Sequence, residues 1–326
     1  MVTILISSAG RRVELIHCFR TDAKACGLDL RVMAVDLNPE MSSACQAADK
    51  CFRVSRCTTP EFVSELADIC GTENVRLIVP TIDTELQMLA DHQQEFKATG
   101  ARVLVSSPSV VRMARDKAAT ARFLSEHGIP TPRTASVGEL LAEPDSWNWP
   151  VILKPLGGSS SVGMRRAESL RDARLAATER ADYVAQELLC GREYTVNLFF
   201  DQAGNLRSAV PHYRYEVRAG EVSKGITERE STLVSLAWRL GAILKGAYGP
   251  LCFQAVVSGA GQAHVFEINA RFGGGYPLAH QAGATFTKWL LEETAGLPSS
   301  VNNRWEEGVT MLRYDAAFFR RTNAGT

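Results

Sequence analysis

The sequence predicts an α/β protein that begins with a doubly wound parallel sheet, and three observations near the N-terminus support this. Residues 3–6 form a short apolar run typical of a buried strand. A turn of small and basic residues follows, and then the helical pattern of residues 13–24. Residues 31–35 are a second apolar strand that ends at Asp36. Strand, small-residue turn, helix and a strand ending in an acid are the usual start of such a sheet.

The composition allows two domains and argues against several classes of function. A chain of 326 residues is long enough for two domains, or for one domain with an inserted lid. Basic and acidic residues are equal at 36 each, so no net charge favours nucleic acid or an anionic membrane. No apolar run approaches the ~20 residues of a membrane span, and the N-terminus resembles a first strand rather than a signal peptide. We therefore expect a cytoplasmic protein.

The cysteines predict neither a zinc site nor a disulfide framework. There are eight, and no Cys-x-x-Cys pair occurs among them. The even spacing of Cys45, Cys51 and Cys57 fits no zinc motif. A chain of this size with a full core needs no disulfides, so we expect reduced and mostly buried thiols.

A candidate ligand site follows the third predicted strand, residues 76–79. Asp83 and Glu85 come just after the carboxyl end of this strand, where open α/β sheets bind ligands. They are placed to hold an ammonium group of a substrate, or to charge the first turn of a helix over residues 85–99. The dinucleotide fingerprint G-x-G-x-x-G is absent, with only Gly10 in the first turn, which disfavours nicotinamide binding.

The middle of the chain contains two lysines and a glycine-rich loop. A helix is expected to run through residues 106–128 and to carry Lys117. An apolar strand ends in Lys154, an unusual core residue because a buried ammonium needs an anionic partner. Residues 157–163 follow, and their N–H groups and hydroxyls are suited to cradle phosphate. The loop lacks the P-loop pattern, and a plain flexible hairpin is the alternative.

Acidic residues lie on either side of a predicted turn at Gly191, which joins a strand that begins at Tyr183 to a second strand over residues 194–200. Glu187 and Glu193 are placed to hold a nucleoside, although each taken alone is more often a surface acid. Residues 211–225 are rich in charge and predict a loop or edge hairpin near the site.

The most informative stretch is residues 265–271, an apolar strand with polar side chains on one face. Side chains alternate along a strand, so Glu267 and Asn269 project together and Arg271 follows. Gln254 lies on the strand expected to pair with it. A carboxylate and a carboxamide are hard oxygen ligands suited to Mg²⁺, and arginine is a forked donor for phosphate or carboxylate. The alternative is a solvent-facing strand that ends in a glycine-rich turn.

Taken in order, these segments resemble the ATP-grasp enzymes, nearest to their carbamoyl phosphate synthase-like branch. The resemblance spans almost the whole chain, as a single stand-alone unit without a glutaminase region. It is carried by Lys117, Leu-Lys154-Pro, residues 157–163, Glu187-x-x-x-Gly191-x-Glu193, Gln254 and Glu267-Ile-Asn269-x-Arg271. It implies a pre-ATP-grasp domain over residues 1–110 and an α+β ATP-grasp domain over 111–326, with a lid over about 118–187.

The resemblance also implies a role for each group of residues. The ATP phosphates would contact Lys117, Lys154, Gly157, Gly158, Ser159, Ser160 and Gly163. The adenine would lie against Gln186, Glu187, Leu188 and Leu189, and the ribose would lie on Glu193. The metal would be held by Gln254, Glu267 and Asn269. The residues implied for catalysis are Arg271 and Lys154. The candidate substrate contacts are Asp83, Glu85, Arg214, Lys224 and Gly274.

The activity implied by the resemblance is an ADP-forming ligation of a small carboxylate to an amine through an acyl phosphate. It would use ATP and Mg²⁺, with Mn²⁺ as a second candidate metal. Many ATP-grasp enzymes have an acid where Gln254 stands, which puts a second metal in question. The alternatives are an enzyme that stops at a carbamoyl or acyl phosphate, and a non-catalytic ATP-binding regulatory partner. The residues leave a monomer or a homodimer open.

Overall fold

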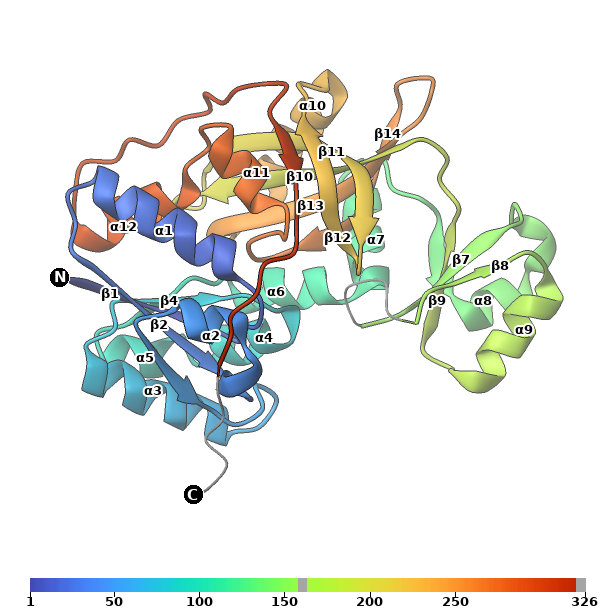
Figure 1. The fold of residues 1–326 in the computed structure, drawn as a ribbon. Coiled ribbons are helices and arrows are strands. Elements are labelled where there is room, and N and C mark those ends of the chain that lie inside the picture. The colour runs from blue at the N-terminus through green and yellow to red at the C-terminus, as the bar shows by residue number, and fades with distance from the viewer. Residues whose placement is uncertain (158–162, 321–326) are drawn as a thin grey trace.

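The structure, a computed structural model, describes residues 1–157 and 163–320. These residues form three β-sheets with five, six and four strands (Figure 1). The two larger sheets lie together, and the four-stranded sheet stands apart at the right of the view.

The five-stranded sheet belongs to the N-terminal third of the chain and is parallel throughout. Its strands are β1 (Val2–Ser7), β2 (Leu30–Asp36), β3 (Lys50–Arg53), β4 (Leu77–Pro80) and β5 (Arg102–Val103). The order β3-β2-β1-β4-β5 puts the first strand in the middle, as in a doubly wound sheet. The predicted fold class is therefore confirmed, although the sequence does not predict β3.

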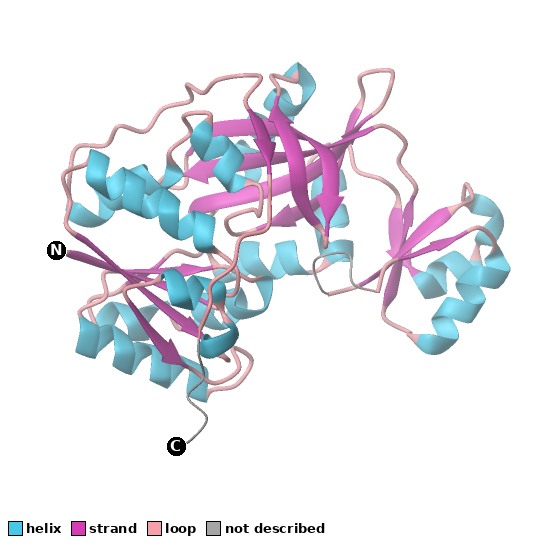
Figure 2. Ribbon diagram, in the orientation of Figure 1, coloured by secondary structure: helices cyan, strands magenta, loops and turns pink. Residues whose placement is uncertain are grey.

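Helices cover both faces of this sheet (Figure 2). They are α1 (Val13–Ala25), α2 (Ser43–Ala47), α3 (Glu61–Glu73), α4 (Asp83–Asp91) and α5 (Gln93–Ala98), with a 3₁₀ turn η1 (Pro39–Met41). Leu5 of β1 packs in one hydrophobic cluster with Phe62 of α3, whereas Ile4 and Ile6 pack in another with Phe19 of α1. Both faces of β1 are thus buried, which explains its continuous apolar run.

The helix predicted over residues 106–128 is two helices, α6 (Pro108–Arg115) and α7 (Lys117–Glu126). Asp116 between them has the extended angles φ −102° and ψ 111°, and its side chain accepts a hydrogen bond from the Ala119 N–H at 2.9 Å. Aspartate is a strong N-cap because its carboxylate satisfies a free N–H of the first turn. The break places Lys117 in the first turn of α7.

The prediction that all cysteines are reduced is wrong for one pair. Cys45 of α2 and Cys51 of β3 form a disulfide, with their Cα atoms 5.4 Å apart. The contact arises because β3 returns alongside β2 directly after α2, and the spacing of these cysteines in sequence does not reveal it. Of the other cysteines, Cys18, Cys70 and Cys252 are buried thiols.

The four-stranded sheet and its helices, which we call the lid after the prediction above, have a core of their own. Its strands are β6 (Thr134–Ser136), β7 (Val151–Pro155), β8 (Arg165–Ala167) and β9 (Tyr183–Glu187), in the order β6-β9-β7-β8. Its helices are α8 (Val137–Ala142) and α9 (Leu170–Glu179), with a 3₁₀ turn η2 (Pro144–Ser146). Trp147, Val151, Leu153 and Tyr183 pack in a hydrophobic cluster separate from the other two.

The six-stranded sheet is antiparallel. Its strands are β10 (Arg192–Phe200), β11 (Leu206–Arg218), β12 (Glu221–Thr227), β13 (Gly249–Val257), β14 (Ala263–Asn269) and β15 (Thr310–Leu312). Their order is β14-β13-β10-β11-β12-β15. The charged residues 211–225 form the hairpin of β11 and β12, but not at the edge, because β15 pairs with β12.

The two larger sheets pack together through two hydrophobic clusters, each of which contains residues of both sheets. Three helices contact the six-stranded sheet. They are α10 (Ser231–Ile243), α11 (Tyr276–Gln281) and α12 (Phe286–Ala295). Phe19 of α1 packs edge-on against Phe272, and Trp289 of α12 belongs to the same cluster. Among the described residues, no helix combines the length and apolar character that crossing a membrane requires.

Candidate functional site

A cavity of about 390 Å³ lies where the lid, the six-stranded sheet and the N-terminal domain meet. The lid contributes the facing strands β7 and β9, and the six-stranded sheet contributes β13 and β14. The N-terminal domain contributes the loops after β1 and β4, and the glycines at positions 273–275 line the same space. The cavity therefore gathers residues from almost the whole chain.

Strands β13 and β14 bring the three predicted metal ligands together. Gln254 lies opposite Glu267 in the register, and both line the cavity with Asn269. The register shifts by one residue just after this pair, so Phe266 and Glu267 both reach the cavity although they are adjacent in sequence. A bulge is a common device for redirecting a side chain beside a site.

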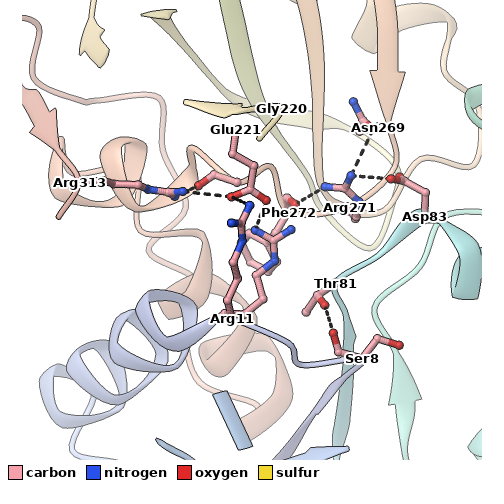
Figure 3. A network of polar contacts seen from close by, with 12 residues as sticks. Ser8, Arg11, Thr81, Asp83, Gly220, Glu221, Asn269, Arg271, Phe272 and Arg313 are labelled. Atoms are coloured by element: carbon pink, nitrogen blue, oxygen red, sulfur yellow. Dashed lines mark hydrogen bonds and ion pairs between the residues drawn. The ribbon is translucent and has the colours of Figure 1, made fainter. Parts of the chain in front are cut away.

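Arg271 is fixed in the cavity wall by ion pairing with the N-terminal domain. One terminal nitrogen lies 2.5 Å from Oδ2 of Asp83 and 3.5 Å from Oδ1 of Asn269, and the other donates to the Phe272 carbonyl at 3.0 Å (Figure 3). Burial alone would lower the pKa of Arg271, but the Asp83 carboxylate outweighs it, so the pKa is raised. The guanidinium is therefore charged and held in one orientation.

Lys154 is buried, and a neutral side chain holds it. Its Nζ donates to Oε1 of Gln186 at 2.6 Å and lies 4.6 Å from the centre of the Phe266 ring. Burial lowers the pKa of Lys154 to about 8, and Lys117 adds to this, while Glu267 opposes it. An anion in the cavity would raise the pKa of Lys154 again, so the site favours a negatively charged ligand.

The side chain of Gln186, predicted to lie against the adenine, makes two hydrogen bonds within the protein. Its side chain is buried, since Oε1 accepts from Lys154 and Nε2 donates to Oγ1 of Thr134 at 2.9 Å. Both ends of the carboxamide are used, so it orients the lysine and has little capacity left for a base.

The other residues predicted for the nucleotide fall into three groups. Those that line the cavity are Lys117, Gly157, Glu187, Leu188, Leu189 and Glu193. Gly163 lies outside the residues that line it, and its carbonyl accepts from the Tyr183 hydroxyl at 2.9 Å. Three predicted residues lie outside the described part of the chain: Gly158, Ser159 and Ser160.

Of the five residues predicted to contact the substrate, three line the cavity and two do not. Asp83, Arg214 and Gly274 line the cavity. Glu85 does not, because it is fully buried. It accepts hydrogen bonds from the Ser7 and Ser8 hydroxyls at the end of β1 and from the Thr81 and Ile82 N–H groups just before α4. Lys224 is exposed and pairs with Glu216 at 2.7 Å. The substrate assignments of Glu85 and Lys224 are therefore corrected, because neither lines the cavity and both carboxylate and ammonium are used in contacts within the protein.

The sequence does not identify one charged cluster at the cavity. Glu221 lies 2.8 Å from Arg12, 3.0 Å from Arg313 and 3.4 Å from Arg11 (Figure 3). Burial would raise the pKa of Glu221, but the three guanidinium groups outweigh it and lower the pKa. The only sequence signal is the Arg11-Arg12 pair in the first turn, because the other members are some 200 and 300 positions away.

The donor set at β13 and β14 fits magnesium and not a dedicated metal cage. The described residues contain no group of three or more His, Cys, Asp or Glu side chains able to hold a metal ion. Glu267 and Asn269 supply one anionic and one neutral oxygen beside Lys154 and Arg271. Mg²⁺ commonly takes one or two protein oxygens and completes its octahedron with water and phosphate.

Two family descriptions match the chain. Residues 4–104 match the family described as PylC-like, N-terminal domain, and residues 114–275 match the family described as ATP-grasp domain. A D-alanine–D-alanine ligase of Bordetella pertussis is 36% identical over 98 residues, which is 28% of this chain and 31% of the relative. The chain spans about a third of the length of such curated relatives.

Solved structures show the fold over a longer stretch. The biotin carboxylase domain of Hydrogenobacter thermophilus 2-oxoglutarate carboxylase, solved with MgADP and bicarbonate, is similar with a TM-score of 0.73 and 16% identity. The similarity covers 93% of this chain and 72% of that chain. The L-amino acid ligase of Bacillus licheniformis gives a TM-score of 0.71 at 16% identity, covering 92% of this chain and 75% of that chain.

Proposed function

We propose, from the premise that this chain contains an ATP-grasp domain behind a PylC-like N-terminal domain, that the protein is an ATP-dependent carboxylate–amine ligase. The observation that carries the proposal is the cavity wall. It combines Lys154, Arg271 and the oxygen pair of Glu267 and Asn269. Relatives named D-alanine–D-alanine ligase and L-amino acid ligase support the same reaction class.

We assign the lid side of the cavity to ATP. Lys154 and Lys117 would bind the phosphates, the 187–189 segment would lie along the base, and Glu193 would bind the ribose. Gln254, Glu267 and Asn269 would hold Mg²⁺, or Mn²⁺ in its place, against the phosphates. The bound metal would neutralise charge on the transferring phosphoryl group. We keep the division into residues 1–110 and 111–326, with the lid over about 118–187, as part of the proposal.

The chemistry needs positioning and charge neutralisation from this chain. A carboxylate oxygen of the substrate attacks the γ-phosphorus of ATP, the bond to the bridging oxygen breaks, and ADP leaves. Arg271, fixed by Asp83, stabilises the equatorial oxygens of the phosphoryl group as it moves. The amine nitrogen then attacks the acyl carbon, phosphate leaves with the electron pair, and the nitrogen loses a proton.

The amide product distinguishes this reaction from its alternatives. The test is a phosphate-release screen of amino-acid and small-acid pairs with ATP and Mg²⁺, with each hit checked by mass spectrometry. We expect at least one pair to give an amide together with ADP and phosphate. Phosphate release without any amide would favour an enzyme that stops at the acyl phosphate. ATP binding without turnover of any pair would favour a regulatory ATP-binding protein.

A further inference from the structure

The charged cluster at the far end of the cavity joins three distant parts of the chain. We call Arg11, Arg12, Glu221 and Arg313 the Glu221 cluster. Arg12 lies in the loop between β1 and α1, Glu221 is the first residue of β12, and Arg313 follows β15 directly. In Figure 3, Arg313 and Arg11 approach the Glu221 carboxylate from different sides.

The cluster has more positive charge than its own carboxylate can balance. Three guanidinium groups surround one carboxylate, which leaves an excess of two positive charges. The side chains of Arg12 and Arg313 are only 19% and 26% exposed, whereas Arg11 is 62% exposed and reaches solvent. Partly buried positive charge without a full partner is costly, so the position favours an incoming anion.

This excess faces the cavity. Arg12 and Glu221 line it together with Gly273, Gly274 and Gly275. Arg313 lies directly behind this wall, where it donates a hydrogen bond to the Gly274 carbonyl and pairs with Glu221. Arg12 is also close enough to Arg271 for their charges to interact. The Glu221 cluster therefore belongs to the same cavity as Arg271, the residue proposed to act on the phosphoryl group.

We propose that Arg12 and Arg313 bind a substrate carboxylate other than the one that is phosphorylated. The planar fork of arginine suits a carboxylate, and both guanidinium groups already hold one in Glu221. At least one substrate then carries an unreacted carboxylate. Either the amine substrate is an amino acid, or the acid substrate is a dicarboxylate. This inference rests on the proposed ligase function.

Arg313 joins the Glu221 cluster from the C-terminal segment of the chain. It lies beyond both matched ranges, which end at residues 104 and 275. Its position depends on the pairing of β15 with β12, which places residue 313 beside the start of β12. The backbone N–H of Arg313 also donates to the Ser223 carbonyl at 2.9 Å, so the side chain projects from an anchored residue.

The test compares ligands that differ only in the unreacted carboxylate. Calorimetry with MgADP present measures binding of L- and D-amino acids and their primary amides in one arm. The other arm uses small dicarboxylates, such as succinate and glutarate, and their monoamides. We expect the amide to bind roughly ten- to a hundred-fold more weakly in one arm, since a charge-assisted hydrogen bond is lost. The arm that responds identifies which substrate carries the carboxylate.

Arg313→Gln supplies the second half of the test. If Arg313 binds the carboxylate, the variant loses most of the preference for acid over amide, whereas Arg313→Lys retains part of it. Equal binding of acid and amide by the unaltered chain, or absence of binding in both arms, would overturn the proposal. So would a preference that Arg313→Gln leaves intact. Binding needs no turnover, so failure of the amide screen counts against the ligase proposal separately.

Arg218→Ala is the matched control. Arg218 pairs with Asp315 at 2.6 Å, so it also ties β11 and the C-terminal segment together. The side chains of this pair are 59% and 82% exposed, and neither residue pairs with Glu221 or belongs to its cluster. We expect Arg218→Ala to keep the preference for acid over amide. If it loses that preference as Arg313→Gln does, the effect comes from docking of the segment and the proposal is wrong.

Discussion

The two ends of the cavity are built in different ways. The lid end takes its polar side chains from paired strands. Lys154 of β7 donates a hydrogen bond to Gln186 of β9, and Gln254 of β13 lies opposite Glu267 of β14. The far end takes Arg12, Glu221 and Arg313 from separate parts of the chain and joins them through ion pairs and the pairing of β15 with β12. The lid end is therefore a product of local strand geometry, whereas the far end is a product of the tertiary fold. We expect substitutions at the lid end to change nucleotide chemistry, and substitutions at the far end to change substrate choice.

The largest effect is expected from Glu267→Gln. The change keeps the shape but removes the only full negative charge among the proposed metal ligands, and Mg²⁺ prefers anionic oxygen. We expect turnover to fall by roughly a thousand-fold, since metal stabilisation of the transferring group contributes several kcal/mol. Asn269→Ala should cost less, because water can replace a neutral ligand. Amide formation across a Mg²⁺ titration measures both, and normal turnover of Glu267→Gln at sub-millimolar Mg²⁺ would remove the metal from this strand.

Arg271→Lys should lower turnover while leaving ATP affinity almost unchanged. The lysine keeps a positive charge near Asp83 but loses the planar fork that holds several donors in place. We expect turnover to fall by roughly ten- to a hundred-fold while ATP affinity stays within a factor of ~3. Single-turnover kinetics and calorimetry measure the two quantities. Weaker ATP binding with unchanged turnover would mean that Arg271 binds the nucleotide and not the moving phosphoryl group.

Lys154→Met tests the phosphate contact at the lid end. Methionine keeps much of the stem but removes the ammonium group that Gln186 orients. Loss of a charge-assisted hydrogen bond predicts ATP binding weaker by roughly ten- to a hundred-fold at unchanged thermal stability. Gln186→Leu is the positioning control and should have a smaller effect in the same direction. Unaltered affinity in Lys154→Met would assign the phosphates to other residues.

The smallest expected effect is a pH dependence that belongs to the lid end alone. Because the pKa of Lys154 is about 8 without ligand, the amine is charged below that pH and neutral above it. Bound phosphate favours the charged form, so ATP binding takes up protons near pH 8.5, and affinity falls as the pH rises through 8. Calorimetry in buffers of different ionisation enthalpy measures the proton uptake. The uptake should vanish in Lys154→Met and persist in Arg313→Gln.

The same contrast explains how much the sequence predicts. The strand with Glu267 and Asn269, its pairing with the strand of Gln254, and the placement of Lys154 all follow from side-chain alternation and local composition. The parallel N-terminal sheet follows from its apolar strands. These features depend on neighbouring residues, so short patterns contain the information.

The far end depends on contacts that no short pattern contains. β15 has only three residues, and it forms because it pairs with β12, more than 80 positions earlier in the chain. Without that pairing, Arg313 has no predictable neighbour. For Glu85 the local pattern suggests too much. Its position after a strand suggests a ligand site, but its carboxylate is buried and accepts hydrogen bonds from four protein donors.

The central claim is that the lid end activates a carboxylate by transferring the γ-phosphoryl group of ATP to it. The most direct measurement uses an acid substrate labelled with ¹⁸O in both carboxylate oxygens, with the released phosphate analysed by mass spectrometry. Attack by a carboxylate oxygen on the γ-phosphorus predicts one ¹⁸O in each phosphate released, and the second ¹⁸O in the amide carbonyl. Phosphate that carries no label while amide is formed would contradict the acyl phosphate route.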